Sequence, residues 1–121
     1  MKFIAKVHEP IYDYNNKKYI RLIIPAKVSE IIERMHINKW HLLQNTNIDN
    51  PIDGNILTVK VPFRYRRVMC EVQGKPIQSL IKGDETDIEV EFKGPWNVGN
   101  YSGYSWVLKS LKFVTAKEVT S

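Results

Sequence analysis

Apolar and polar residues alternate along much of this chain, which is the pattern of β-strands with one face on a core and one face in water. Near the N-terminus the alternation predicts a strand over Lys2–His8, in which every second residue is apolar. The Asp- and Asn-rich segment Pro10–Lys17 is typical of a turn, and Lys18–Ile24 has the composition of a second strand. The first two elements are therefore expected to form a hairpin.

A different period follows this hairpin. Pro25 ends the second strand and suits the first position of a helix. From Ala26 to about Ile37 the apolar residues recur at intervals of three and four, which predicts one amphipathic helix. The residues expected on its inner face are Val28, Ile31, Ile32 and Met35.

The middle of the chain returns to loop and strand patterns. Residues 44–55 are rich in Asn, Asp and Gly and predict a long surface loop. Asn55–Tyr65 predicts a strand that contains Pro62, so that a sheet edge or a bulge is expected there. The side chains expected on the core face of this strand are Leu57, Val59, Val61, Phe63 and Tyr65.

The last third is again strand-like. We expect a short strand over 67–72, a turn or a single helical turn over 74–81, and a final strand over Ser105–Val114. Between them lies a strand whose inward positions are Thr86, Ile88, Val90 and Phe92. With no internal repeat, this order predicts a mostly β fold, a small barrel of five to seven strands with one short amphipathic helix.

Size and composition agree with a single globular domain. A chain of 121 residues with 43% hydrophobic residues fits one domain, residues 1–121, with its own core. It holds no run of about 20 apolar residues and no signal-peptide pattern at its start. Because Cys70 is the single cysteine, no internal disulfide can form. An intracellular location, in the cytoplasm or the nucleoid, is therefore expected.

The charge is concentrated in the middle of the chain. The formal net charge is +5. Residues 60–83 hold six basic residues and one acidic residue, a net of +5, whereas residues 1–59 carry +2 and residues 84–121 carry −2. A basic stripe of this kind favours contact with phosphates, although solvated charge that keeps the protein soluble is the alternative.

Two segments combine aromatic and basic or flexible residues. Gly94–Trp106 holds four aromatic residues and three glycines, and we expect an open loop on which unpaired bases stack. The alternative is that Trp96 and Trp106 anchor the core. Phe63–Arg67 interleaves two aromatics with Arg64, Arg66 and Arg67. These arginines suit phosphates and bases, or protect a sheet edge from pairing with another chain.

Patterns that would indicate catalysis are missing. The three histidines have no metal-ligand spacing with Cys70 or with carboxylates, so no metal and no other cofactor are expected. There is no phosphate loop, no nucleophile elbow and no dinucleotide-binding glycine motif. We therefore expect a protein that is not an enzyme.

A resemblance to a known family supports a nucleic-acid ligand. The turn Lys82-Gly83-Asp84, the strand after it, Trp96 and the segment from Trp106 to Lys109 resemble the closing half of OB-fold single-stranded DNA-binding proteins, over about residues 80–114. The resemblance implies that the expected small barrel is OB-like. It also implies that Trp96, Tyr101 and Tyr104 form a stacking loop, with Lys93 and Lys109 near phosphates. That family places its helix between its third and fourth strands, whereas this chain places one after the second.

A second resemblance implies a different ligand. Tyr19–Pro25 followed by a short amphipathic helix is similar to the swapped-hairpin domains of AbrB-type regulators, which dimerise and bind duplex DNA. The Gly-Asp turn that usually follows the helix in that family is replaced here by Asn38–His41.

The sequence thus favours a non-enzymatic protein that binds single-stranded DNA in replication, recombination or repair. RNA in place of DNA, a homo-oligomer, and a replication or repair protein as partner stay open, and no membrane partner is expected. The alternatives are a duplex-binding regulator, an accessory subunit that binds another protein, and a viral inhibitor. The residues expected to bind nucleic acid are Lys60, Arg64, Arg66, Arg67, Lys93, Trp96, Tyr101, Tyr104, Trp106 and Lys109.

Overall fold

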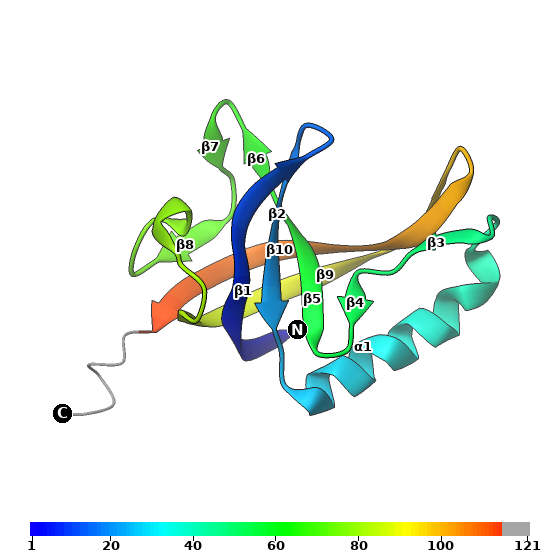
Figure 1. Ribbon diagram of the computed structural model, residues 1–121, viewed down its shortest axis with the longest axis horizontal. Helices are drawn as coiled ribbons and strands as arrows, with labels where there is room; N and C mark the ends of the chain where they lie inside the picture. The colour runs from blue at the N-terminus through cyan, green and yellow to red at the C-terminus, as the bar shows by residue number, and fades with distance from the viewer. Residues whose placement is uncertain (115–121) are drawn as a thin grey trace.

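The computed structural model describes residues 1–114 of the chain. It consists mostly of β-strands, with one α-helix and two single 3₁₀ turns (Figure 1). In chain order the elements are β1 (Lys2–Tyr14), β2 (Lys17–Ile23), α1 (Ala26–Lys39), η1 (Trp40–Leu42), β3 (Asn47–Asp49), β4 (Ile52–Asp53), β5 (Ile56–Val61), β6 (Phe63–Arg64), β7 (Arg67–Val68), β8 (Glu71–Gln73), η2 (Ile77–Ser79), β9 (Glu85–Val98) and β10 (Tyr101–Val114).

Five strands form a ring of backbone hydrogen bonds. β1 pairs with β2 on one side and with β9 on the other, and β9 pairs with β10, all antiparallel. β2 pairs with β5, and β5 meets β10 in parallel where Lys60 lies opposite Val107. The ring order is therefore β1-β2-β5-β10-β9 and back to β1. The expected mostly β, barrel-like fold with one short helix is confirmed.

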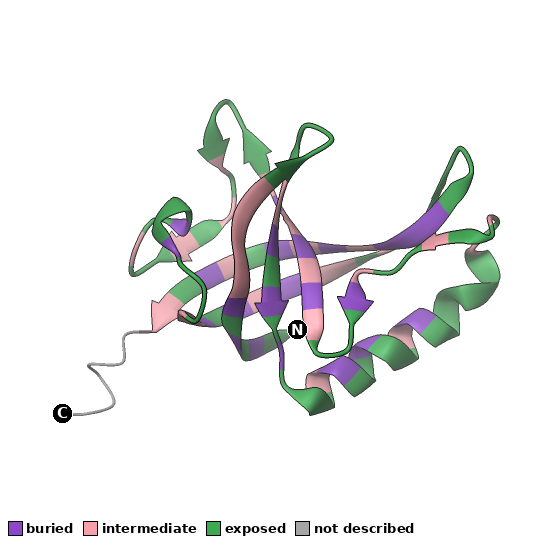
Figure 2. Cartoon of the chain, viewed as in Figure 1, coloured by how far each residue is buried: buried purple, intermediate pink, exposed green. Residues whose placement is uncertain are grey.

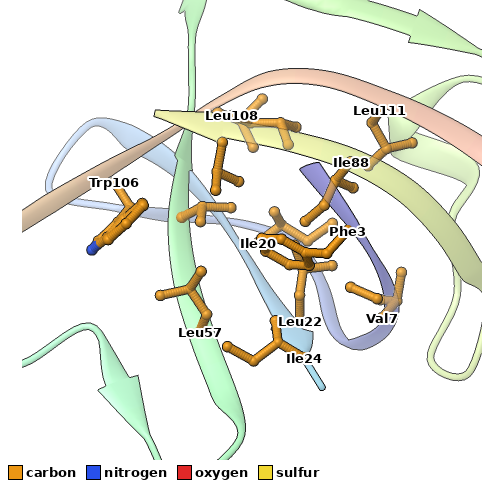
Figure 3. Packing of buried hydrophobic residues seen from close by; sticks show 14 of the residues in the cluster. Phe3, Val7, Ile20, Leu22, Ile24, Leu57, Ile88, Trp106, Leu108 and Leu111 are labelled. Carbon is orange, nitrogen blue, oxygen red and sulfur yellow. The ribbon is translucent and has the colours of Figure 1, made fainter. Parts of the chain in front are cut away.

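The ring encloses the hydrophobic core because alternate side chains of each strand point inward. Figure 2 shows this as alternating buried and exposed bands along the strands. Figure 3 shows several of these side chains packing against one another. Core residues contributed by the five ring strands include Phe3, Val7, Ile20, Leu22, Leu57, Val59, Ile88, Val90, Trp106, Leu108 and Leu111.

Three hairpins project from the ring, and the segment that follows the helix reaches the tip of one of them, where Asn97 is hydrogen-bonded to Leu42 and Gln44. In the view of Figure 1 the tips of β1–β2, β6–β7 and β9–β10 lie along the upper edge, and α1 lies along the lower edge. A single turn, η2, connects the β8 region to β9, and its Ile77 and the following Leu80 are buried. The expected helical turn within 74–81 is thus confirmed.

The first hairpin is longer than the sequence pattern indicated. The expected turn over Pro10–Lys17 is wrong, because β1 continues to Tyr14 and the turn is Asn15–Asn16 alone. Both asparagines have positive φ, 52° and 63°, which matches the strand twist of tight hairpins and which asparagine tolerates well. Register shifts on both sides of Glu9 accommodate Pro10 within β1.

The helix forms where its period predicted, and most of its expected inner face is confirmed: Ile32 is buried, and Val28 and Met35 pack against the core. It extends two residues past Ile37, and its buried residues are Ser29, Ile32 and His36. Ile31, expected on the inner face, is 41% exposed. The buried stripe of α1 is narrow, and the Ser29 hydroxyl donates to the carbonyl of Gly54, in the turn between β4 and β5, at 2.8 Å.

Pro62 ends the third ring strand. Leu57, Val59 and Val61 point inward as expected. The expectation that Phe63 and Tyr65 face the core is wrong, because both are exposed. Proline cannot donate a ladder hydrogen bond, and the chain beyond it forms the separate hairpin β6–β7.

The Gly94–Trp106 segment forms two strands and a tight turn. β9 and β10 are each 14 residues long and are joined by Gly99 and Asn100. The expected open loop over this segment is wrong. The turn expected before β9 is confirmed: Gly83 has φ of 96°, and a carboxylate oxygen of Asp84 accepts a hydrogen bond from the amide of Ile81 at 2.9 Å.

Candidate nucleic-acid interface

The outer surface of the ring carries a row of four side chains that the strand register aligns. Tyr12 on β1 lies opposite Tyr19 on β2, and Tyr19 lies opposite Lys60 on β5. Lys60 in turn lies opposite Val107 on β10. All four are partly exposed. We name Tyr12, Tyr19, Lys60 and Val107 the outer row.

The two tyrosines of the outer row form an aromatic platform. Their ring centroids are 5.9 Å apart, and the ring planes differ by 30°. The guanidinium of Arg21 lies 5.6 Å from the ring centroid of Tyr12 and forms an ion pair with Glu9 at 3.4 Å. Aromatic faces with a cation alongside them are suited to stacking bases and to holding phosphates.

Positive charge gathers at the lysine end of the platform. Burial, and after it the neighbouring Lys17 ammonium, lower the pKa of Lys60. Neither lysine forms an ion pair within residues 1–114. Two cations that repel one another and form no ion pair in this part of the chain favour an anionic ligand at this place.

An open groove adjoins the outer row. It lies between the tip of the β1–β2 hairpin and the beginning of β6, with a volume of about 620 Å³. The ammonium of Lys18 forms an ion pair with Asp13 and lies 4.8 Å from the ring centroid of Phe63. The residues that line the groove are Asp13, Tyr14, Asn15, Asn16, Lys17, Lys18, Lys60, Val61 and Phe63.

The β6–β7 hairpin carries the three arginines that the sequence singled out. Arg64 and Arg67 lie directly opposite one another, and Tyr65 and Arg66 form the turn between them. We name residues 64–67 the arginine hairpin. All four are exposed, and none of its arginines forms an ion pair within residues 1–114. Like charges placed opposite one another destabilise a hairpin, so this arrangement does not serve folding.

Trp96 and Tyr101 face outward on the β9–β10 hairpin. Trp96 lies opposite Gly103, and the ring of Trp96 covers the place where a Cβ of residue 103 would stand. Trp96 is half-buried and Tyr101 is 58% exposed. Asp49 lies opposite Gly103 of this hairpin and is also close to the platform. Burial is the larger cause that raises the pKa of Tyr19, and the Asp49 carboxylate raises it further.

Tyr104 and Trp106 do not belong to an open surface. Trp106 is 2% exposed and Tyr104 is 5% exposed. The Tyr104 hydroxyl donates to the carbonyl of His36 at 2.8 Å, and its ring is stacked on that imidazole. The expectation that these two residues stack bases is wrong. Alternation along β10 turns both away from the outer surface: Trp106 belongs to the core, as Figure 3 shows, and Tyr104 packs against His36 of α1.

Lys93 and Lys109 flank a carboxylate on the outer side of β9 and β10. Their ammonium groups lie 3.3 Å and 3.2 Å from the two carboxylate oxygens of Glu91. Hydrogen bonds from Lys109 and Lys93 lower the pKa of Glu91. Part of their charge is therefore already neutralised, and their contact with phosphates stays a prediction.

The structure brings together some of the predicted residues and adds others. Lys60 joins the outer row, whereas Arg64, Arg66 and Arg67 form a hairpin beyond the groove. Sequence reasoning missed Tyr12 because a turn was expected over 10–17. Tyr19 and Arg21 lie in the expected second strand, but without Tyr12 in the first strand they had no aligned partner. The Asn15–Asn16 pair was the signal: counting outward from a two-residue turn aligns Tyr12 with Tyr19.

No group of three or more histidine, cysteine or acidic side chains within residues 1–114 is arranged to hold a metal ion. No helix in this described part is long and apolar enough to cross a membrane. Neither a family model, nor a curated protein, nor a solved structure matches the chain.

Proposed function

We propose that the protein binds single-stranded DNA without catalysing a reaction, and that it acts in DNA replication, recombination or repair. In this proposal the DNA strand lies across the outer row. Its bases stack on Tyr12 and Tyr19, and its phosphates contact Lys60 and Lys17. The groove continues this path toward the arginine hairpin.

The observation that carries the proposal is the alignment of Tyr12, Tyr19 and Lys60 by the register of three neighbouring strands. A base that stacks on an aromatic ring contributes about 1–3 kcal/mol, whatever its sequence. Such ring faces are useful to unpaired bases, because in a duplex each base is covered by its neighbours. A platform of rings beside cations therefore favours a single strand over a duplex.

The position of the platform in the ring adds support by analogy with a fold. In OB-folds the face of the second and third strands and the two adjoining hairpin loops bind oligonucleotides. The second and third strands of the present ring are β2 and β5, which carry Tyr19 and Lys60. The analogy raises the expectation of a nucleic-acid ligand, and the chemistry of the residues supports it independently.

The test is a titration of a labelled single-stranded oligonucleotide by fluorescence anisotropy at low and at moderate salt. Tyr19→Ala should weaken binding by about 1–3 kcal/mol. Trp40→Ala is the control, because Trp40 is an aromatic residue, 58% exposed, on η1 and outside both the outer row and the groove. Absence of binding at low salt would contradict the proposal. An equal loss of oligonucleotide affinity in Tyr19→Ala and Trp40→Ala would also contradict it.

Competition with duplex DNA in the same titration addresses the regulator alternative. If unlabelled duplex displaces the labelled oligonucleotide at the same concentration as unlabelled single-stranded DNA, the protein is a duplex binder. RNA of the same sequence serves as a third competitor and decides between DNA and RNA.

One observation favours a second candidate, an accessory subunit that binds another protein. Ile37 is 71% exposed and Trp40 is 58% exposed at the C-terminal end of α1. Exposed tryptophan is enriched among residues that dominate protein interfaces. A stoichiometric partner that Trp40→Ala releases, without any nucleic-acid binding, would favour this candidate.

A further inference from the structure

The arginine hairpin is separate from the ring that carries the platform. β6 and β7 form a two-stranded sheet of their own, closed at its base by a hydrogen bond from the amide of Met69 to the carbonyl of Pro62 at 2.8 Å. Figure 1 shows the hairpin projecting at the same edge as the β1–β2 tip. Phe63 at its base lines the groove, and Tyr65 stands two residues farther out.

Tyr65 is the most exposed large hydrophobic side chain among residues 1–114. It is 85% exposed, and its ring has no aromatic or cationic partner in this part of the chain. A tyrosine in this position contributes nothing to the core. Its open ring face is available to a ligand.

The turn holds Tyr65 in an unfavourable backbone conformation. Tyr65 has φ of 54° and Arg66 has φ of 61°. Two-residue turns of this kind favour asparagine and glycine, whereas a bulky residue at positive φ is strained. The Asn15–Asn16 turn of the neighbouring hairpin meets this preference. The backbone strain at Tyr65 and the repulsion between Arg64 and Arg67 both oppose folding of the hairpin. They therefore indicate that these residues serve to bind a ligand.

We propose that Tyr65 stacks on the last base pair at a junction between single-stranded and double-stranded DNA. This inference rests on the proposed function. One strand leaves the duplex and enters the groove, where Phe63 and Lys60 lie, while Arg64 and Arg67 on the two strands of the hairpin contact the phosphates of the diverging strands. The ligand is therefore a forked duplex, bound more tightly than a single strand of equal length.

The position of the Tyr65 side chain favours a contact with a duplex end at a junction over a further base-stacking position within the groove. Rings that stack bases along a groove form part of its wall, as Tyr14 and Phe63 do. Tyr65 is outside the set of residues that line the groove and stands at a hairpin apex. A duplex end exposes one uncovered base-pair face, which is the surface that an isolated, projecting ring can cover.

The experiment compares two labelled ligands by anisotropy at one salt concentration: a single strand, and a fork whose single-stranded arm has the same length and sequence. The intact chain should bind the fork about tenfold more tightly. Tyr65→Ala should abolish this preference and change single-strand affinity by less than about twofold. Tyr65→Phe should keep the preference because stacking does not need the hydroxyl, and Tyr19→Ala should weaken both ligands equally.

A second readout follows the junction itself. With 2-aminopurine in the last base pair of the fork, the intact chain and Tyr65→Phe should change its fluorescence, and Tyr65→Ala should not. The inference is overturned if the intact chain binds the single strand and the fork with equal affinity. It is also overturned if Tyr65→Ala still prefers the fork, or if Tyr65→Ala weakens the binding of both ligands by the same factor. Failure of the intact chain to bind single strand overturns the proposed function instead.

Discussion

The indole Nε1 of Trp106 donates a hydrogen bond to Nε2 of His36 at 2.9 Å, inside the protein. This bond joins β10 to α1, two elements 70 residues apart in the chain. It requires the neutral imidazole, because protonation of Nε2 would replace the acceptor with a second donor. The imidazole also stacks on Tyr104, with ring centroids 3.9 Å apart and planes within 2° of parallel. An uncharged histidine is therefore one of the groups that attach the helix to β10.

Stability should fall in acid because of His36. Burial lowers its pKa from 6.5 to about 4. Between these values the unfolded chain binds a proton that the folded chain does not, so the free energy of unfolding is highest above pH 6.5 and decreases as pH falls toward 4. The difference is about 3 kcal/mol at most. Urea unfolding of the intact chain near pH 7 and near pH 4.5 measures it.

His36→Gln separates this effect from the titration of carboxylates. Glutamine can accept from the Trp106 indole and does not titrate, so the variant should lose less stability between the two pH values. His41→Gln, at an exposed position, is the control and should behave as the intact chain. If His36→Gln lost as much stability between the two pH values as the intact chain, the imidazole of His36 would not be the group that titrates.

Two tryptophans on one hairpin should have opposite roles. Trp106→Ala should destabilise the fold by about 3–5 kcal/mol, because its ring fills the core. Trp96→Ala should instead weaken oligonucleotide binding by about 1–3 kcal/mol, since its ring faces outward. Denaturant unfolding and anisotropy on both variants measure the difference. Unchanged affinity in a folded Trp96→Ala variant would leave Trp96 with a structural role alone.

The arginine hairpin should influence the salt dependence of binding. Each arginine that contacts a phosphate contributes about 0.7 to the slope of log affinity against log salt for a single strand. With the fork as ligand, Arg64→Gln and Arg67→Gln should each reduce the slope by about that amount, without loss of stability, because the two like charges repel. Arg34→Gln on the exposed side of α1 is the control. A slope that both hairpin variants leave unchanged would remove these arginines from the interface.

Gly103 should not tolerate a side chain. A Cβ at this position would lie 2.5 Å from the carbonyl oxygen of Asp49 and 2.7 Å from the Trp96 ring. Gly103→Ala should therefore destabilise the protein by about 1–3 kcal/mol and shift tryptophan emission as the Trp96 ring moves. Ser105→Ala, two residues along the same strand, is the control. A neutral Gly103→Ala variant would show that Trp96 does not pack on this glycine.

The local pattern of the chain predicted most of the fold. Alternation in β1, β5 and β9 identified the side chains that point inward, and the three-to-four spacing identified α1. Proline and glycine positions placed several boundaries, including the turn before β9. Where the pattern was wrong, as at Pro10–Lys17 and 94–106, bulges and paired strands replaced expected loops. Backbone hydrogen bonds with distant segments stabilised strands that polar or glycine-rich composition did not indicate.

The candidate interface was predicted less well. The sequence by itself determined that positive charge is concentrated in residues 60–83 and that aromatic residues gather near the C-terminus. It could not determine which of these side chains reach the surface, because Trp96 on β9 and Trp106 on β10 have similar local composition and differ only in the face of the sheet on which they lie. It also could not align Tyr12 and Tyr19 with Lys60. That alignment depends on register between strands far apart in the chain, which only the closed ring decides.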